Sequence, residues 1–155
     1  MSKKISIFAF SIFVSLIAGG IGSIATIPNI PSWYAQLDKP PLLPPNELFG
    51  PVWTALYILI GIALGLIILH KANNKKGAYW WFGVQLALNT LWSVVFFGLH
   101  QPWAAAVTIV ALIVSIVVTM KKFHKLVPAT LWLFLPYLAW VCFATYLNVG
   151  VAVLN

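Results

Sequence analysis

The sequence LFGPVWTALYILIGIALGLIILH, residues 48–70, contains no charged side chain. A helix needs about 20 mostly apolar residues to cross the hydrocarbon core of a bilayer. Four other stretches of the chain reach or approach this length. We therefore predict an all-α membrane protein, a five-transmembrane-helix bundle in a single domain over residues 1–155, with helices at about 5–27, 48–70, 78–99, 103–120 and 127–154.

The composition of the chain excludes a soluble protein. Of its 155 residues, 62% are hydrophobic and 7% are charged, whereas a soluble domain has about 25% charged residues. So few charges cannot cover a water-facing surface, and the lipid bilayer is therefore an expected partner. The formal net charge is +7, but the chain has no soluble surface on which to build a basic face, so we expect no nucleic-acid binding.

The lysines predict how the helices are oriented in the membrane. All nine basic residues are lysines, and eight of them lie in three tracts, at 3–4, 71–76 and 121–125. With five crossings, all three tracts fall on one side of the membrane. Because cytoplasmic loops are enriched in lysine and arginine, we expect the N-terminus inside and the C-terminus outside. This bias, without a recognisable targeting presequence, predicts a multi-pass protein of a bacterial cytoplasmic membrane.

The linker between the first two predicted helices, residues 28–47, contains six prolines together with Trp33 and Tyr34. Proline fixes its own φ and restricts the residue before it, so this linker is expected to be stiff and extended. A stiff, aromatic segment above a helix bundle favours a lid over a binding site. An alternative is an anchor at the membrane interface, where tryptophan and tyrosine are enriched.

The third predicted helix carries a polar and aromatic stripe. Residues at three- and four-residue spacing share one face of a helix, and this face carries Gln85, Asn89, Trp92, Ser93 and Phe96. Asn89 falls near the middle of the span, where an unpaired amide is costly, so the face is expected to point into the bundle. Its plainer interpretation is a hydrogen bond that holds two helices together.

Aromatic residues also line one face of the second and the fifth predicted helix. Trp53 and Tyr57 are one turn apart, and Trp140 and Ala144 follow Pro136, which is expected to kink the fifth helix. The three faces would meet in a cavity walled by aromatic rings, suited to a planar and largely apolar ligand. A bundle core simply filled by these rings fits the pattern equally well.

The sequence contains no recognisable catalytic motif. It has no phosphate-binding loop, no paired carboxylates and no nucleophile with an adjacent base. The three histidines, at 70, 100 and 124, lie at helix ends or in loops and are poorly placed to share a metal. We therefore expect no metal site and no cofactor.

Four groups of residues occur in an order that is typical of one known family. They are Trp33-Tyr34, Leu37-Asp38-Lys39-Pro40 and Pro44-Pro45 in the linker; Phe49-Gly50-Pro51-Val52-Trp53-Thr54-Ala55-Leu56-Tyr57; Gln85, Leu88, Asn89, Trp92-Ser93 and Phe96-Phe97; and Leu135-Pro136-Tyr137, Trp140, Phe143-Ala144 and Leu147-Asn148. Through these motifs, nearly the whole chain resembles a bacterial member of the TspO/MBR family, the translocator proteins or peripheral-type benzodiazepine receptors.

The resemblance implies a homodimeric five-helix protein that binds porphyrins such as protoporphyrin IX, and other flat aromatic ligands, in a pocket closed by its first loop. By position, Trp53 and Trp140 are similar to the tryptophans that flank the bound ring. The remaining pocket residues implied by the resemblance are Tyr34, Pro44, Tyr57, Asn89, Trp92 and Ala144.

The resemblance leaves three functions open. One is a receptor or transporter for porphyrins. Another is light-dependent porphyrin degradation, with Trp53 and Trp140 as the only catalytic candidates. The third is a tetrapyrrole or stress sensor.

A sterol site of the kind proposed in mitochondrial members is not expected, because Val149 stands where the family's tyrosine would be. Small residues spaced by four are candidates either for a dimer face or for close packing inside the bundle: Ser15, Gly19 and Ser23; Gly61 and Gly65; Gly83 and Ala87.

Overall fold

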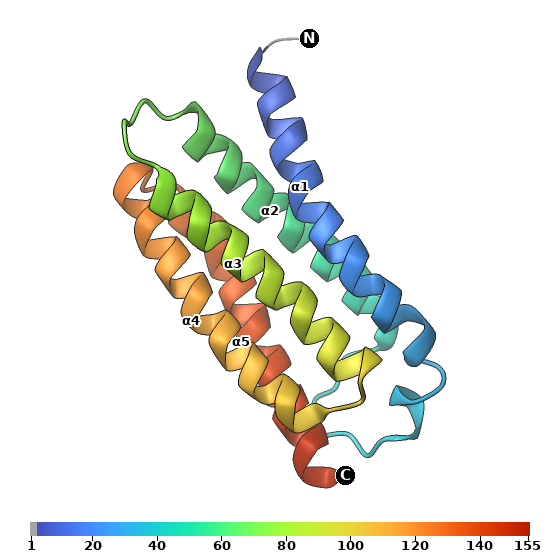
Figure 1. Ribbon diagram of the computed structural model, residues 1–155. Helices are drawn as coiled ribbons and strands as arrows, with labels where there is room; N and C mark the ends of the chain where they lie inside the picture. The colour runs from blue at the N-terminus through green and yellow to red at the C-terminus, as the bar shows by residue number, and fades with distance from the viewer. Residues whose placement is uncertain (1–2) are drawn as a thin grey trace.

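The computed structural model describes residues 3–155 and contains the five predicted helices (Figure 1). Each of them is long and apolar enough to cross a membrane. The predicted fold class, an all-α bundle of five transmembrane helices, is therefore confirmed. The bounds of the helices are Lys3–Thr26 (α1), Phe49–Leu69 (α2), Lys76–Ser93 (α3), Pro102–Leu126 (α4) and Thr130–Leu154 (α5).

The helices form a closed ring in which sequence neighbours are not always spatial neighbours. α1 packs along α2 and α3, α3 packs on α4, α4 packs on α5, and α5 completes the ring against α2. The order around the bundle is therefore α1, α2, α5, α4, α3. The first described residues and the C-terminus lie at opposite ends of the bundle (Figure 1), as an odd number of crossings requires.

α4 is longer than the sequence pattern predicted, since it ends at Leu126 rather than at Met120. The prediction stopped at the first lysine because it followed hydropathy. Lysine is a good helix former, however, and its long stem lets the charge reach the headgroups while the backbone stays helical. Phe123 lies in this extension, is fully buried, and packs with ring-centroid distances of 5.7 Å to Phe82 and 5.5 Å to Phe134.

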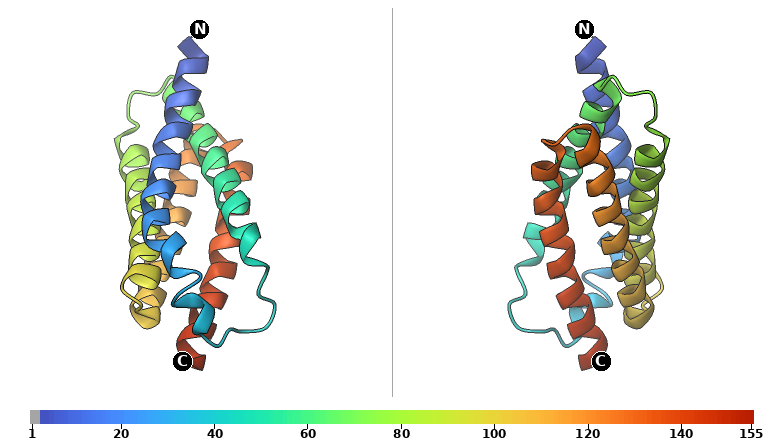
Figure 2. Two further views of the ribbon diagram at one scale, coloured as in Figure 1. Left: turned by 90° about the vertical axis from the view of Figure 1, so that its right-hand side faces the viewer. Right: turned by 90° about the vertical axis from the view of Figure 1, so that its left-hand side faces the viewer.

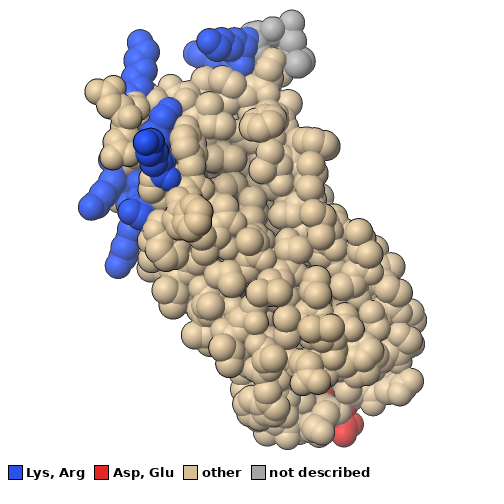
Figure 3. All heavy atoms as spheres, viewed as in Figure 1, with Lys and Arg blue, Asp and Glu red and all other residues tan. Residues whose placement is uncertain are grey.

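On the face shown in Figure 3, lysine side chains gather at the end of the bundle where the described chain begins, and an acidic side chain appears at the other end. Lys39, in the first loop, lies apart from these lysines. One of the gathered lysines also caps the C-terminus of a helix. Lys75 Nζ donates to the backbone carbonyl oxygens of Ile67, Ile68 and His70, at 3.2, 3.0 and 3.0 Å. These carbonyls lie at the C-terminal end of α2, where a cation is favoured by both hydrogen bonding and the helix dipole. We call this half of the molecule the lysine end.

At the lysine end, α1 and α2 are in close contact because α2 carries glycines there. A methyl group on Gly61 would lie 2.6 Å from Ile12 Cα, and one on Gly65 would collide with the ring of Phe8. These two glycines, which the sequence offered as candidates for a dimer face, are therefore used for packing inside the bundle. Toward the other end, α1 and α2 spread apart (Figure 2). Dimerisation itself stays a prediction.

The first loop, residues 28–47, crosses the spread end of the bundle and is fastened to α5. Asn155 Oδ1 accepts a hydrogen bond from the Asp38 backbone N–H at 3.0 Å, and Asn155 Nδ2 donates to the Asp38 carbonyl at 2.9 Å. Tyr146 Oη donates to the Pro41 carbonyl at 2.8 Å. On the other side of the loop, the rings of Trp33 and His100 stack with centroids 4.4 Å apart. We call this half of the molecule the loop end.

Candidate ligand-binding site

A cavity of about 390 Å³ lies at the loop end, between the first loop and the helices. This volume is within the range of small-molecule sites in proteins. Its walls come from α1, α2, α5, the loop, the end of α3 and the π-helical turn η4 (Val94–Gly98) that follows α3. The lining residues include Gly19, Gly20, Ser23, Tyr34, Phe49, Trp53, Tyr57, Trp92, Phe96, Phe97, Ala144 and Asn148.

The α2 wall of the cavity consists of stacked rings. Trp53 and Tyr57 are one helical turn apart, and their rings stack with centroids 5.8 Å apart. The Trp53 ring also lies 6.3 Å from the rings of Trp92 on α3 and Tyr137 on α5. Trp53 therefore stands where three helices meet, as the sequence pattern predicted for the aromatic stripes.

The α3 wall depends on a change of helical geometry. The Leu99 backbone N–H donates to the Val94 carbonyl at 2.8 Å, a five-residue step typical of a π-helical turn. Phe96 and Phe97, consecutive in sequence, both line the cavity from this turn. Trp92 is held in place one turn earlier, because its indole N–H donates to Asn148 Oδ1 on α5 at 2.9 Å.

The loop contributes Tyr34, which is only 6% exposed. Its ring packs against the rings of Phe96 and Phe97, with centroid distances of 6.2 and 5.6 Å. Lys39 Nζ lies 4.9 Å from the centroid of the same ring, within cation–π range. Burial raises the pKa of the Tyr34 phenol above its ordinary value of 10.0. The buried ring thus closes the cavity on the loop side as a neutral group.

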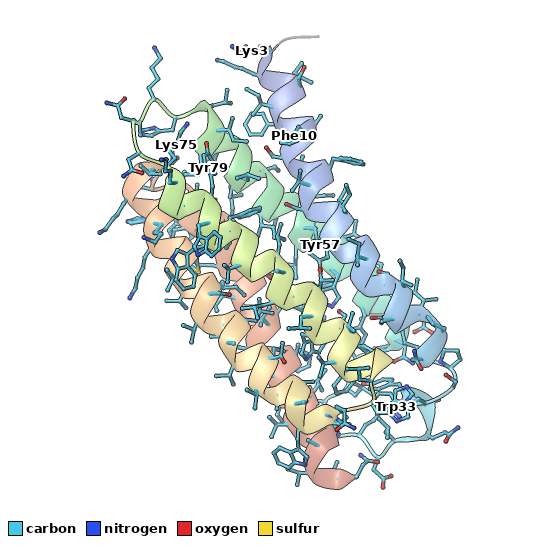
Figure 4. All side chains as sticks on the ribbon, viewed as in Figure 1. Lys3, Phe10, Trp33, Tyr57, Lys75 and Tyr79 are labelled. Atoms are coloured by element: carbon cyan, nitrogen blue, oxygen red, sulfur yellow. The ribbon has the colours of Figure 1, made fainter. Side chains whose placement is uncertain are left out.

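A chain of buried hydrogen bonds runs from Tyr57 into the bundle. Tyr57 Oη donates to Asn89 Oδ1 at 2.5 Å, Asn89 Nδ2 donates to Tyr137 Oη at 2.9 Å, and Tyr137 Oη donates to Gln85 Oε1 at 2.8 Å. Asn89 is 1% exposed and does not line the cavity. Its amide instead fixes the position of the Tyr57 ring, which lies midway along the bundle beside α1 (Figure 4).

The structure places five of the eight predicted site residues on the cavity wall: Tyr34, Trp53, Tyr57, Trp92 and Ala144. Asn89 lies behind Tyr57, and the half-buried Pro44 belongs to the loop beyond the lining. Trp140 packs against Phe49, a lining residue, with ring centroids 5.8 Å apart. Its indole Nε1 is buried and has no hydrogen-bond partner within residues 3–155.

The contribution of α1 to the site was not predicted from the sequence. Gly19, Gly20 and Ser23 line the cavity, whereas the sequence pattern indicated either a dimer face or packing inside the bundle for Gly19 and Ser23. A methyl group on Gly19 would collide with the Tyr57 ring, so glycine is what lets α1 lie against that ring. The signal in the sequence was the run of small side chains on the first helix. It could be interpreted only once the order of the helices around the bundle was known, because that order places α1 beside the aromatic face of α2.

The chemistry that this wall supports is stacking and burial of an apolar molecule. Within residues 3–155, no group of three histidine, cysteine, aspartate or glutamate side chains is placed to hold a metal ion. Trp92 and Asn148, both polar lining residues, satisfy each other. Fold and site therefore define a class of integral membrane protein: a five-helix bundle with an aromatic cavity beneath its first loop.

The chain belongs to the TspO/MBR family, whose model matches residues 11–154. It is 43% identical over 145 residues to the tryptophan-rich protein TspO of Archaeoglobus fulgidus, covering 94% of both chains. It is 42% identical to the protein of the same name from Chlorobaculum tepidum, over 100% of this chain and 99% of that one. The human translocator protein is 35% identical over 119 residues, 75% of this chain and 70% of the human one.

Proposed function

We propose that this protein binds porphyrins, of which protoporphyrin IX is the test case, together with other flat aromatic molecules in the cavity at the loop end. The observation that carries the proposal is the cluster of rings around Trp53, which lies within 6.3 Å of the rings of Tyr57, Trp92 and Tyr137. Aromatic faces arranged in this way favour a planar ligand, which gains both buried area and stacking.

The buried N–H of Trp140 supports a ligand with a polar edge. A buried donor without an acceptor costs about 1–3 kcal/mol, and Trp140 Nε1 has no acceptor within the described residues. Because Trp140 packs on Phe49 at the cavity wall, a small shift of either side chain would bring this donor to the ligand. A carbonyl or carboxylate oxygen on the ligand would then remove the cost.

The family membership and the names of the relatives agree with a binding or transport role more closely than with a conventional enzyme. Relatives are named tryptophan-rich protein TspO and translocator protein, and in this chain Trp53 and Trp92 line the cavity while Trp140 packs behind Phe49. Following the lysine bias, we place the lysine end on the cytoplasmic side and the cavity in the outer half of a bacterial cytoplasmic membrane. A ligand bound there is held at membrane depth, beneath the loop.

The test is a fluorescence titration of the full-length protein in lipid nanodiscs with protoporphyrin IX. We expect saturable quenching of tryptophan emission, and a loss of affinity of about 30-fold for Trp53→Ala, since about 2 kcal/mol of aromatic burial and stacking is removed. The matched control is Trp132→Ala, because Trp132 is 73% exposed on the outside of α5. Equal affinities of Trp53→Ala and Trp132→Ala would reject this cavity as the porphyrin site.

A further inference from the structure

Part of the cavity wall is exposed on the outside of the bundle. Five lining residues are exposed. Asn46 lies in the short turn before α2, and the other four lie on two neighbouring segments: Gly20 in α1 and Ile27 directly after it, and Gly50 and Thr54 at the start of α2. All four fall inside the segments that are long and apolar enough to span the membrane. We call these four residues the α1–α2 window. In a bilayer, this side of the cavity would therefore face the lipid.

The window is open at both glycines. Apart from the neighbouring backbone of its own helix, a methyl group added to Gly20 or to Gly50 would meet no atom of residues 3–155 within 4 Å. Gly19, one residue away, is the opposite case, since its added methyl group would collide with Tyr57. Figure 2 shows the same change along the helices, because α1 and α2 cross near the lysine end and separate toward the loop. The gap is therefore confined to the height of the cavity.

The hydroxyl side chains along the window are hydrogen-bonded to backbone carbonyls, so an apolar molecule that passes them would not have to strip them of water. Thr54 Oγ1 donates to the Gly50 carbonyl at 2.9 Å, and Ser23 Oγ donates to the Gly19 carbonyl at 2.9 Å. Thr26 Oγ1 likewise donates to the carbonyl of Gly22 at 3.0 Å. Each hydroxyl is thus bonded within its own helix, which makes this passage suitable for a lipid-soluble molecule.

The loop, by contrast, is closed over the top of the cavity. Tyr34 is 6% exposed, and Asn155 and Tyr146 hold the loop through hydrogen bonds to the backbone of Asp38 and Pro41. The loop also packs closely on α5, since a methyl group on Gly150 would lie 2.5 Å from Pro40 Cγ. Entry from above would require all these contacts to break, whereas entry through the window requires none of them to break.

We propose that the ligand enters and leaves the cavity sideways, from the bilayer, through the α1–α2 window while the loop stays docked. This inference rests on the proposed function and narrows the ligand class to aromatic molecules that are already dissolved in the membrane. It also means that the loop shapes the bound state, whereas Gly20 and Thr54 control the rate of exchange with lipid.

The experiment measures association and dissociation rates of protoporphyrin IX, added from donor vesicles, by stopped-flow quenching of tryptophan emission. Gly20→Phe narrows the window from α1 and Thr54→Phe narrows it from α2, so the result does not depend on one variant folding. The control for added bulk is Ala111→Phe, because Ala111 is an exposed residue of α4 that does not line the cavity. Asn155→Ala combined with Tyr146→Phe loosens the loop and leaves the window unchanged.

We expect Gly20→Phe and Thr54→Phe to slow association and dissociation together, by about tenfold, because an obstructed passage raises the barrier in both directions. Ala111→Phe and the loop variant should keep the wild-type rates within about twofold. Wild-type rates in both window variants, or an effect on affinity through dissociation alone, would overturn the lateral route, as would rates that rise severalfold in the loop variant. Absence of any binding by the wild-type protein would instead refute the proposed function itself.

Discussion

The two ends of the bundle use the same residue type, glycine, for opposite purposes. At the lysine end, Gly61 and Gly65 bring α2 against the backbone of Ile12 and the ring of Phe8. At the loop end, a methyl group added to Gly20 or Gly50 would meet no atom of another segment within 4 Å, so there is space beside both glycines on the same two helices. One pair of helices is therefore packed at one end and separated at the other.

This difference indicates how a small membrane protein holds a cavity without losing its fold. A bundle with no water-filled core depends on close packing and satisfied polar groups. The close packing lies at the lysine end, and the hydrogen bonds through Asn89 and Tyr137 connect α2, α3 and α5 in the middle of the bundle. The loop end can then enclose empty volume, which stability alone would not favour.

The largest expected effect is on the packed end. Gly61→Leu would place a side chain into the backbone of Ile12, where nothing flexible can yield, and we expect it to lower the free energy of unfolding by about 3 kcal/mol or more. Gly20→Leu, in the open end, should change it by about 0.5 kcal/mol or less. The measurement is unfolding of the reconstituted protein by sodium dodecyl sulfate, followed by circular dichroism. Similar losses in both variants would remove the contrast between the two ends.

The next effect concerns the junction between the ends. Asn89→Leu leaves the hydroxyls of Tyr57 and Tyr137 without their amide partner, and we expect a loss of unfolding free energy of about 2 kcal/mol. Adding Tyr57→Phe removes one of the stranded hydroxyls, so the double variant should be less destabilised than the sum of the single ones. Strict additivity in this double-mutant cycle would show that the chain of hydrogen bonds does not act as a unit.

A smaller effect is expected at Trp140. Trp140→Phe keeps a large aromatic ring but removes the unpaired indole N–H, so it should weaken protoporphyrin binding by about fivefold, close to 1 kcal/mol. The same change at the exposed Trp132 should have no effect on affinity. If Trp140→Phe also bound as tightly as the wild-type protein, Trp140 would act only through packing.

The smallest expected effect concerns pH and the loop. Because burial raises the pKa of Tyr34 above 10.0, the neutral phenol is favoured when the loop is docked. The neutral Tyr34 phenol therefore stabilises the docked loop fully below pH 10, and this stabilisation is lost as the pH rises through the raised pKa of Tyr34. The difference in phenolate absorbance between the wild-type protein and Tyr34→Phe isolates this titration. A midpoint at or below 10 would show that Tyr34 is not buried by the loop.

The fold could be predicted because hydropathy and lysine spacing are local features of the sequence, which do not depend on which helices are neighbours. A spanning helix needs only a long apolar run, and the stripe of Gln85, Asn89, Trp92 and Phe96 on the third helix follows from helical periodicity alone. These four residues are all buried. The helical extension through Phe123 was missed because hydropathy ends where lysines begin, whereas helix propensity does not.

The site was less predictable because it depends on which helices are neighbours. Trp53, Tyr57, Trp92 and Ala144 share recognisable faces and do meet. The wall from α1 was missed, because small residues look the same whether they face a ring, a second protomer or lipid. The π-helical turn that turns both Phe96 and Phe97 to the cavity likewise has no signal at helical spacing.

A structure of the full-length protein with protoporphyrin IX bound would show whether the cavity holds the ligand. We predict density for the macrocycle at the loop end, against Trp53 and Trp92 and beneath Tyr34, with the α1–α2 packing around Gly61 unchanged. An empty cavity, with the porphyrin seated in the outer groove of α5 between Tyr146 and Val153 or elsewhere on the lipid-facing surface, would contradict this prediction.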